Sequence, residues 1–515
     1  MSLKMSTSSK NPRPDWINVT TVVAAASVSS ACIYFWRKRR QQQQNPPIPR
    51  HERFSVAYGD RDLSRGQIIG PRGQAALAPP LPYLGSFLTC LENQCHPDHN
   101  PKGHIALCVA ENKLVLDILA ERFMQTGSTG FSDSSVFTYN SMLGMPVARE
   151  AAAYFLARRF LWKSNDASSD PDHALQEIKP KHIGYGTGCA ALINHVFFLL
   201  GQKGDCCLIP KPYYAAFEND INLIAQIHPF GIDQSRPAEG PTVAELNAAF
   251  KQAKRQGYKP KFILITNPNN PLGTIYSSEV MQRMIDWARE KEMHIVVDEI
   301  YALSTHSKQS SFESVLSLLN NDLGHDVHML WAVSKDFGGS GLRCGLLYSQ
   351  NELLMEGLAT LSIFTCVSGP IQYLTAELLT DDSFVDSFLD ESRRRIAASY
   401  DICTTKLEEM VIPFVKAEAG LFVYVDFSSL LPEKTYEWEE ALGKLFFEHA
   451  RVVLTPGQSQ RDPNPGRFRI CYAWVTPQVL EIAMERLSRL VAKIRRSPDD
   501  VWDPANERMF AGVLE

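Results

Sequence analysis

Short runs of apolar residues recur along the central part of the chain, and each run leads into a group of polar residues. Unbroken apolar runs of this kind are typical of strands that are buried on both faces of a parallel sheet. The clearest runs lie at residues 206–209, 262–265, 294–297 and 328–333.

A helical pattern lies between the second and third of these runs. Ser277 or Ser278 offers an N-cap, and apolar residues then recur at helical spacing as far as Lys291. Because strands alternate with helices, the pattern predicts an α/β domain with a mostly parallel sheet. Ligands of such sheets bind beyond the carboxyl ends of the strands, where the polar groups of this chain are expected to gather.

The polar groups that follow the runs differ in their chemistry. They are an asparagine-rich turn at 267–273, an acidic and aromatic group at 298–301, a group with a lysine and an arginine at 334–343, and a tyrosine pair at 213–214. Upstream, the glycine-rich turn at 184–188 precedes an apolar helix expected at 189–200, and such a turn presents free backbone N–H groups to an anion. Each group alone has an ordinary explanation as a turn, a cap or a solvated side chain. Their joint order at strand ends favours a binding site.

The N-terminal segment has a different character. From Ile17 to Trp36 there is no charged residue, and four basic residues follow at 37–40. This length suits one crossing of a bilayer, and the basic cluster would place the rest of the chain in the cytosol. We therefore expect a single-pass membrane anchor at residues 17–36, followed by a polar, proline-rich linker that ends at residue 50. Two alternatives are a mitochondrial presequence and a tail without a targeting signal, which would leave the protein cytosolic.

Charge and cysteine content narrow the class of protein. The formal net charge is −5, but residues 1–50 carry eight basic residues against one acidic residue, so the rest of the chain has a charge of −12. An acidic body gives no reason to expect a nucleic-acid partner. The eleven cysteines include no C-x-x-C pair, and Cys206 and Cys207 lie in an apolar run, which favours buried thiols over disulfides. Cys95, His96 and His99 fit a surface loop better than a metal site, so no metal is expected.

Three of the polar groups together resemble a known family. The sequences NPNNPLG at 267–273, DEIY at 298–301 and SKDFGGSGLR at 334–343 are similar to the main motifs of the class I/II aminotransferase superfamily, whose members are fold type I enzymes that depend on pyridoxal 5'-phosphate. AEN at 110–112 and PGRFR at 465–469 are similar to the branch related to 1-aminocyclopropane-1-carboxylate (ACC) synthase. The resemblance covers roughly residues 100–490. It implies the α/β fold type I PLP-dependent transferase fold, with a large, mostly parallel sheet domain and a smaller α/β domain, in a homodimer with sites at the interface.

The resemblance also implies roles for single residues around the cofactor ring. Lys335 would form the Schiff base with the cofactor aldehyde, and Asp298 would pair with the pyridine nitrogen. Tyr301 and Asn270 would reach the ring hydroxyl, and Tyr214 would stack on the ring face. Lys335, Asp298 and Tyr301 are thus the expected catalytic residues, and a lowered pKa of Lys335 would let it exchange imines and move protons near neutral pH.

The phosphate and the substrate would be held by other groups. Arg469 would grip the substrate carboxylate, Glu111 matches the AEN motif near the substrate, and Tyr139 matches a tyrosine that reaches the phosphate of the neighbouring subunit. The residues expected around the phosphate are Gly186, Thr187, Gly188, Ser334 and Arg343. One departure is Ala332, where the superfamily often has a phosphate-binding serine; the loss of one hydrogen bond is worth about 1 kcal/mol.

Several reactions are compatible with these motifs. We expect transamination of an α-amino acid or an amino-acid-like intermediate, with a role in fungal secondary metabolism. β-Elimination by a carbon–sulfur lyase acting on a cysteine conjugate is the main alternative, followed by ACC synthesis and by a non-catalytic relative. The expected division of the chain is an anchor and linker at 1–50, an arm and part of the small domain at 51–130, the large cofactor-binding domain at 131–368, the small domain at 369–500 and a tail at 501–515.

Overall fold

A computed structural model shows the fold of the chain. The structure describes residues 81–126, 131, 133–161, 176–306, 312–502, 510 and 512–514, together with residues 73 and 76. Residues 79–515 form one compact unit, and the elements below all belong to it.

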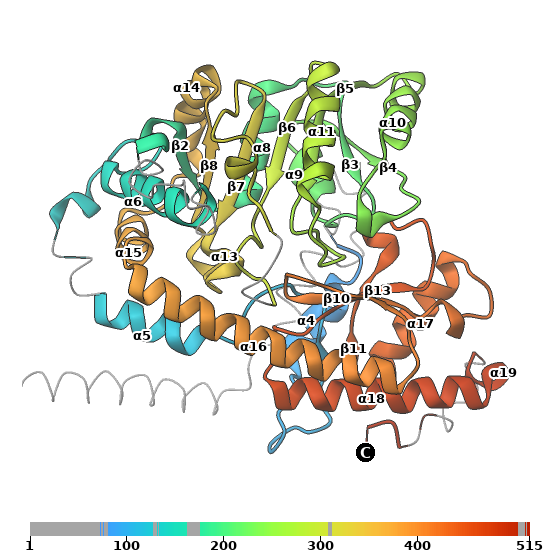
Figure 1. Cartoon of the computed structure of the whole chain (residues 1–515). Helices are drawn as coiled ribbons and strands as arrows, with labels where there is room; N and C mark the ends of the chain where they lie inside the picture. Colours follow the sequence, from blue (N-terminus) through green and yellow to red (C-terminus); the bar gives the residue numbers. More distant parts are fainter. Residues whose placement is uncertain are drawn as a thin grey trace, which may run out of the picture. The chain divides into compact units, whose positions relative to one another are not determined.

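The central element is a seven-stranded sheet (Figure 1). Its strand order is β2-β8-β7-β6-β5-β3-β4, and every neighbouring pair is parallel except the two pairs that β8 makes. The four apolar runs predicted as strands lie in β3, β5, β6 and β7, which confirms the mostly parallel sheet. The strands are β2 Ile183–Gly186, β3 Asp205–Pro210, β4 His228–Ile232, β5 Lys259–Thr266, β6 His294–Asp298, β7 Val327–Ala332 and β8 Gly345–Ser349.

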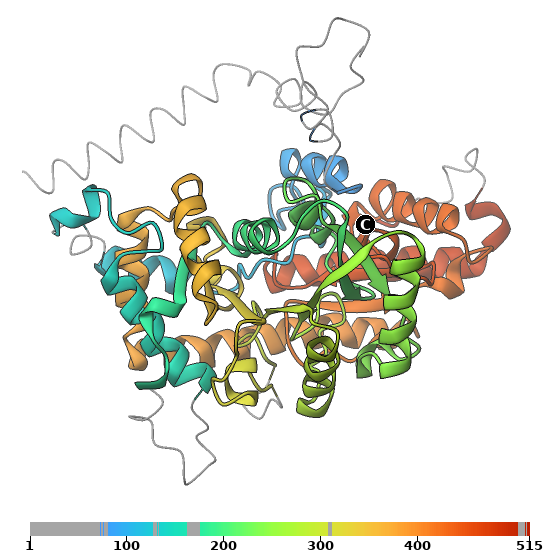
Figure 2. The same ribbon diagram turned by 90° about the horizontal axis from the view of Figure 1, so that it is seen from above.

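Helices cover both faces of this sheet, which explains why its strands read as unbroken apolar runs. Alternate residues of one strand point to opposite faces. Ile263 and Ile265 of β5 join the core formed with helices such as α10 and α11, whereas Phe262 and Leu264 join the core formed with α8 and α14. Figures 1 and 2 show these two layers of helices around the sheet. The main covering helices are α6 Pro146–Leu156, α8 Cys189–Leu200, α9 Phe217–Asn222, α10 Val243–Arg255, α11 Ser278–Glu290, α12 Val315–Leu318, α14 Glu352–Leu361 and α15 Gly369–Leu379.

The two helices predicted from the sequence begin where their caps place them. The side chain of Ser277 accepts a hydrogen bond from the amide of Val280 and caps α11. Gly188 is the N-cap of α8, which spans the predicted residues. One boundary was wrong: Val333, predicted as the end of a strand, begins the short helix α13 Val333–Asp336 instead.

A second, smaller sheet has its own apolar core. Its order is β12-β13-β10-β9, all antiparallel, and the long helices α16 and α18 contribute to the core beside it. The N-terminal strand β1 pairs in parallel with β11, and α4 contacts both strands. The bounds are α4 Leu84–Glu92, β1 Ile105–Ala106, α5 Leu116–Thr126, α16 Asp382–Glu409, β9 Phe414–Val415, β10 Phe422–Asp426, α17 Tyr436–Glu448, β11 Val452–Val453, β12 Thr455–Pro456, β13 Arg467–Cys471, α18 Pro477–Arg496 and α19 Pro498–Val501.

Two expectations from the sequence concern membrane spans and disulfides. Within the described part of the chain, no helix combines the length and apolarity needed to cross a membrane. This finding corrects the single-pass membrane assignment made from the sequence, although the segment at 17–36 itself lies outside the described residues. All ten cysteines in the described part are free thiols, and the adjacent pair Cys206 and Cys207 is buried, as predicted.

Candidate active site

A cavity of about 300 Å³ lies at the carboxyl ends of β5, β6 and β7. Because parallel strands end at the same edge of a sheet, side chains that are distant in the sequence meet there. Eight of the residues predicted for the site line this cavity. They are Tyr214, Asn270, Asp298, Tyr301, Ser334, Lys335, Arg343 and Arg469.

Lys335 lies in the α13 turn that follows β7. Its Nζ donates a hydrogen bond of 2.6 Å to the carbonyl oxygen of Ala110. Burial lowers the pKa of Lys335, and the nearby Arg469 lowers it further, while the charge of Glu111 acts in the opposite direction. The lowered pKa raises the fraction of unprotonated amine near neutral pH, as a nucleophile or a base requires.

Asp298 is the last residue of β6 and is buried beside the cavity. Its Oδ1 accepts a hydrogen bond of 3.2 Å from the amide of Ile300, and no described basic side chain forms an ion pair with it. Burial raises the pKa of Asp298 to about 7, although the Ile300 amide and the charge of Lys335 counteract the shift. A carboxylate in this setting gains most from a cationic group that enters the cavity.

Asn270 connects two other predicted residues. Its Oδ1 accepts a hydrogen bond of 2.8 Å from Nη1 of Arg469, and its Nδ2 lies 3.5 Å from the hydroxyl of Tyr301. Tyr301 is 2% exposed, and its ring meets that of Phe422 edge to face. The turn after β5 and the turn after β6 are thereby joined to β13 of the smaller sheet.

Arg469 is a fully buried cation, with an exposed fraction of 2%. Its Nη2 donates to the carbonyl oxygen of Cys108 at 2.9 Å and to Oγ1 of Thr455 at 3.3 Å, and its guanidinium lies over the ring of Phe422. None of the described carboxylates forms an ion pair with it. A buried charge without a counter-ion is costly, so this site is suited to an anionic ligand.

The glycine-rich turn and Arg343 meet at one end of the cavity. Nη2 of Arg343 donates a hydrogen bond of 3.0 Å to the carbonyl oxygen of Thr187. Gly188 has a φ of +88°, and a Cβ at this position would lie 2.6 Å from Nη2 of Arg343. Only glycine therefore allows the guanidinium to pack on the turn. Gly186, Thr187 and Gly188 do not themselves line the cavity, whereas Cys189 and Ala190, the first residues of α8, do.

Two further predicted residues, Tyr139 and Glu111, also lie outside the cavity lining. Tyr139 is 97% exposed, so within one chain it has no place at the site. Glu111 is half-buried and reaches the site only through its charge, which acts on Lys335. Arg343 lines the cavity but remains exposed in the single chain.

Several lining residues were missed by the sequence analysis. Tyr83 precedes α4, and burial raises its pKa to about 12. Asp220 of α9 is a second carboxyl group in the lining and is partly buried; its removal from solvent, with help from the charge of Asp298, raises its pKa to about 7. Ser340 also lines the cavity, and its hydroxyl donates a hydrogen bond of 2.8 Å to the carbonyl oxygen of Ser334. Ser340 lies within the motif SKDFGGSGLR, so the sequence could have indicated it, but no sequence pattern pointed to Tyr83 or Asp220.

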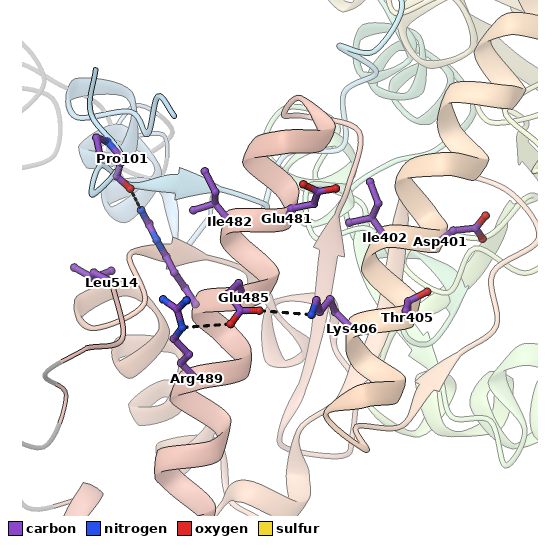
Figure 3. A pocket seen from close by; sticks show the side chains of 11 residues that line it. Pro101, Asp401, Ile402, Thr405, Lys406, Glu481, Ile482, Glu485, Arg489 and Leu514 are labelled. Carbon is purple, nitrogen blue, oxygen red and sulfur yellow. Dashed lines mark hydrogen bonds and ion pairs between the residues drawn. The ribbon is translucent and has the colours of Figure 1, made fainter. Parts of the chain in front are cut away.

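A larger hollow of about 760 Å³ lies elsewhere, along α16 and α18 (Figure 3). Glu485 is paired there with Lys406 at 3.5 Å and with Arg489 at 3.3 Å. This hollow shares no lining residue with the cavity at the strand ends. Glu485, Lys406 and Arg489 are thus paired with each other, in contrast to Asp298 and Arg469.

The donor set of the cavity fits pyridoxal 5'-phosphate. The fit rests on a lysine with a lowered pKa, a buried carboxylate without a cationic partner, and an arginine beside the N-terminus of a twelve-residue helix. Helix N-termini and arginines are favourable surroundings for a phosphate. A carboxylate that lacks a cationic partner is the group that a protonated ring nitrogen needs.

Comparisons with known proteins agree with this site. The family model "Aminotransferase class I and II" matches residues 105–487. The chain is 32% identical to a soybean (Glycine max) 1-aminocyclopropane-1-carboxylate synthase over 83% of this chain and 88% of that protein. It is also 33% identical to the bovine (Bos taurus) 1-aminocyclopropane-1-carboxylate synthase-like protein 1, over 76% of this chain and 77% of that protein.

Solved structures share the fold. An aspartate aminotransferase from Thermus thermophilus with maleate superposes with a TM-score of 0.65 at 20% identity, over 82% of this chain and all of that one. Members of the matched family depend on pyridoxal 5'-phosphate, which confirms the cofactor expected from the motifs, and they are typically homodimers that act on amino acids. The chain belongs to the pyridoxal-phosphate-dependent class I and II aminotransferase family and is related within it to the ACC synthases and ACC synthase-like proteins.

Proposed function

We propose that the protein is an aminotransferase that acts on an α-amino acid. The observation that carries this proposal is that Lys335, with its lowered pKa, and Arg469, buried without a carboxylate partner, line the same cavity. An α-amino acid has one amino group and one carboxylate close together, and these two side chains are suited to receive them.

Each residue has a defined task in this proposal. When bound, the cofactor supplies an electron sink for chemistry at the substrate α-carbon. Lys335 holds the cofactor and carries the proton that leaves the α-carbon, because its lowered pKa leaves part of the amine unprotonated. Asp298 pairs with the ring nitrogen and keeps it protonated, and Arg469 orients the substrate through its carboxylate.

The phosphate end is assigned to a separate group of donors. Arg343, Ser334 and the N–H groups at the start of α8, beside Gly188 and Thr187, would hold the phosphate. The hydroxyl of Ser340 is a candidate to replace the one that Ala332 lacks. Tyr301 and Asn270 would contact the ring hydroxyl, and Tyr214 its face.

The remaining lining favours a substrate with an uncharged side chain. Tyr83 lies close enough to Arg469 for its pKa to respond to that charge, so the segment before α4 borders the carboxylate-binding end. The neighbouring lining residues Leu81, Leu84 and Phe87 are apolar. Among the described lining residues, the cations are Lys335, Arg343 and Arg469, and all three are already assigned.

A product analysis tests the proposed reaction. Purified protein would be given the cofactor and single amino acids, cysteine conjugates or S-adenosylmethionine. Formation of the matching 2-oxo acid with the aminated cofactor supports transamination, provided that Lys335→Ala abolishes it. Pyruvate, ammonia and a thiol from a cysteine conjugate would identify a carbon–sulfur lyase, ACC would identify an ACC synthase, and no turnover of any substrate would indicate a non-catalytic relative.

We also propose that the protein is a homodimer. Exposed apolar residues lie on α8 and just after α9 and α14. They are Phe198, Leu223, Ile224, Ile363 and Phe364. They line or adjoin an apolar hollow that shares Ala190 and Asp220 with the cofactor cavity. A second copy on this face would cover the patch, and it would bring the fully exposed Tyr139 of each chain within the dimer, where it is proposed to contact the cofactor phosphate.

A further inference from the structure

Asp336, the residue after Lys335, is a buried carboxylate held by hydrogen bonds. Its exposed fraction is 1%, and its carboxylate accepts three hydrogen bonds. The donors are Oγ of Ser304 at 2.6 Å, Nε1 of Trp331 at 2.8 Å and the amide of Leu303 at 3.2 Å. Two of these three donors belong to the segment that follows β6.

That segment also carries Tyr301, which lines the cavity. The amide of Ser304 donates to the carbonyl oxygen of Tyr301 at 3.1 Å. Through its hydrogen bond to Asp336, the side chain of Ser304 therefore joins the turn that carries Tyr301 to the turn that carries Lys335, the residue before Asp336. Since each turn is short, a shift of Ser304 relative to Asp336 moves one cavity-lining side chain relative to the other.

The same serine is bonded to the smaller sheet through its backbone. Its carbonyl oxygen accepts a hydrogen bond of 2.7 Å from the amide of Gly420. Gly420 lies two residues before Phe422, the first residue of β10, whose ring lies under the guanidinium of Arg469. Strand β10 pairs with β13, so a hydrogen-bonded path runs from Asp336 through Ser304 and Gly420 to the strand that carries Arg469.

We propose that Asp336 and Ser304 are positioning residues that hold Lys335 in register with Arg469. This inference rests on the proposed function, because it assigns Lys335 to the cofactor and Arg469 to the substrate carboxylate. A displacement of about 1 Å of a reacting group lowers a rate about 100-fold, so a rigid link between these two groups has a catalytic purpose.

The surroundings of Asp336 support a charged, fixed carboxylate. Burial raises the pKa of Asp336 to about 6, but the hydrogen bonds from Ser304, Trp331 and Leu303 and the charge of Arg393 of α16 act against burial. The carboxylate is therefore mostly ionised at neutral pH, and an ionised acceptor makes stronger hydrogen bonds than a neutral one.

The test compares Ser304→Ala, Asp336→Asn and the double variant, each as holoenzyme. We expect each single variant to lower kcat at least tenfold with a smaller change in KM. We also expect each to shift the pH midpoint of the visible absorption of the bound cofactor by about half a pH unit or more. Ser304→Ala removes the bond between the two side chains, and Asp336→Asn weakens it by replacing the charged acceptor with an amide. Because both substitutions act on the same link, the double variant should be no worse than the more severe single variant.

Tyr348→Phe is the matched control. Tyr348 is fully buried and donates a hydrogen bond of 2.8 Å to Oδ1 of Asn321, at the opposite end of the sheet from the cavity. This variant should lower Tm while leaving kcat and the absorption midpoint unchanged. If Ser304→Ala behaves like Tyr348→Phe, with a lower Tm and unchanged kcat and midpoint, the inference is wrong.

The remaining outcomes are also decisive. Multiplicative effects of the two substitutions on kcat would contradict a shared link. If Asp336→Asn fails to fold, Ser304→Ala decides alone, since it leaves the bonds from Trp331 and Leu303 in place. A wild-type protein that binds no cofactor refutes the proposed function, whereas an active wild type with unaffected variants refutes only the positioning role.

Discussion

The replacement of Arg469 by lysine tests how the substrate carboxylate is held. Arg469→Lys keeps a positive charge in the buried site but removes the planar fork of the guanidinium. In the present structure, Nη1 is bonded to Asn270 and Nη2 to the Cys108 carbonyl, so both nitrogens are held in fixed directions. Lysine has a single nitrogen and cannot reproduce both directions.

The expected loss follows from the hydrogen bonds to the substrate. A hydrogen bond to a charged group contributes about 1.5–3 kcal/mol, so losing one of the two bonds of a bidentate pair lowers kcat/KM roughly 10- to 100-fold. We expect the change mainly in KM for the amino acid. The cofactor should remain bound and visible in the absorption spectrum, because Arg469 is not among the groups assigned to hold it.

The assay is steady-state kinetics with the best amino donor, with Arg394→Lys as the control. Arg394 makes two hydrogen bonds of 2.7 Å to Glu391 on the surface of α16, so its substitution removes a similar fork at a remote, 68% exposed site. It should change kcat/KM less than twofold. An Arg469→Lys variant with unchanged KM, or one that loses the cofactor spectrum instead, would refute the assigned role.

Three further predictions concern the cofactor, pH and assembly. Gly188→Ala should weaken cofactor binding at least tenfold. The control Gly204→Ala lies at a similar φ of +97° with open space around it, so it should lower Tm without affecting cofactor affinity. A titration with the cofactor measures the affinity of each variant. Burial raises the pKa of Asp298 to about 7, so the stability of the apoprotein falls as pH rises from 4 to 7 and the carboxylate must ionise in the folded state. Asp298→Asn should therefore raise the Tm of the apoprotein at pH 8 but not at pH 4. Equal shifts of Tm at both pH values would contradict this. Phe364→Asp should convert a dimer to monomers in light scattering, while Val411→Asp, on a different exposed apolar residue, should not.

The fold was predictable because burial on both faces leaves a clear trace in the sequence. The apolar runs of β3, β5, β6 and β7 were recognisable without knowledge of their partner strands. Asp298 follows one of these runs directly, and Lys335 lies two residues after another. Local rules also explain α11, whose cap is a serine at the expected place. The misplaced end of β7 has a physical reason: Val333 favours strands in isolation, but the chain must turn there to bring Lys335 to the cavity.

The rest of the site depends on tertiary contacts that no local pattern reports. Tyr83 and Asp220 come from segments far from the main motifs, and only folding brings them to the cavity. Likewise, the link from Asp336 to Ser304 spans 32 positions and is visible only in the folded chain. Tyr139 differs from these residues, because the role expected from its sequence motif requires a second chain.

The most direct test of the account is to identify the lysine that holds the cofactor. The holoenzyme would be reduced with borohydride, which fixes the cofactor covalently to its lysine, then digested and mapped by mass spectrometry. We expect modification of Lys335 and no modified peptide from the Lys335→Ala variant. Modification of another lysine, or an unmodified Lys335 in protein that carries the cofactor, would contradict it.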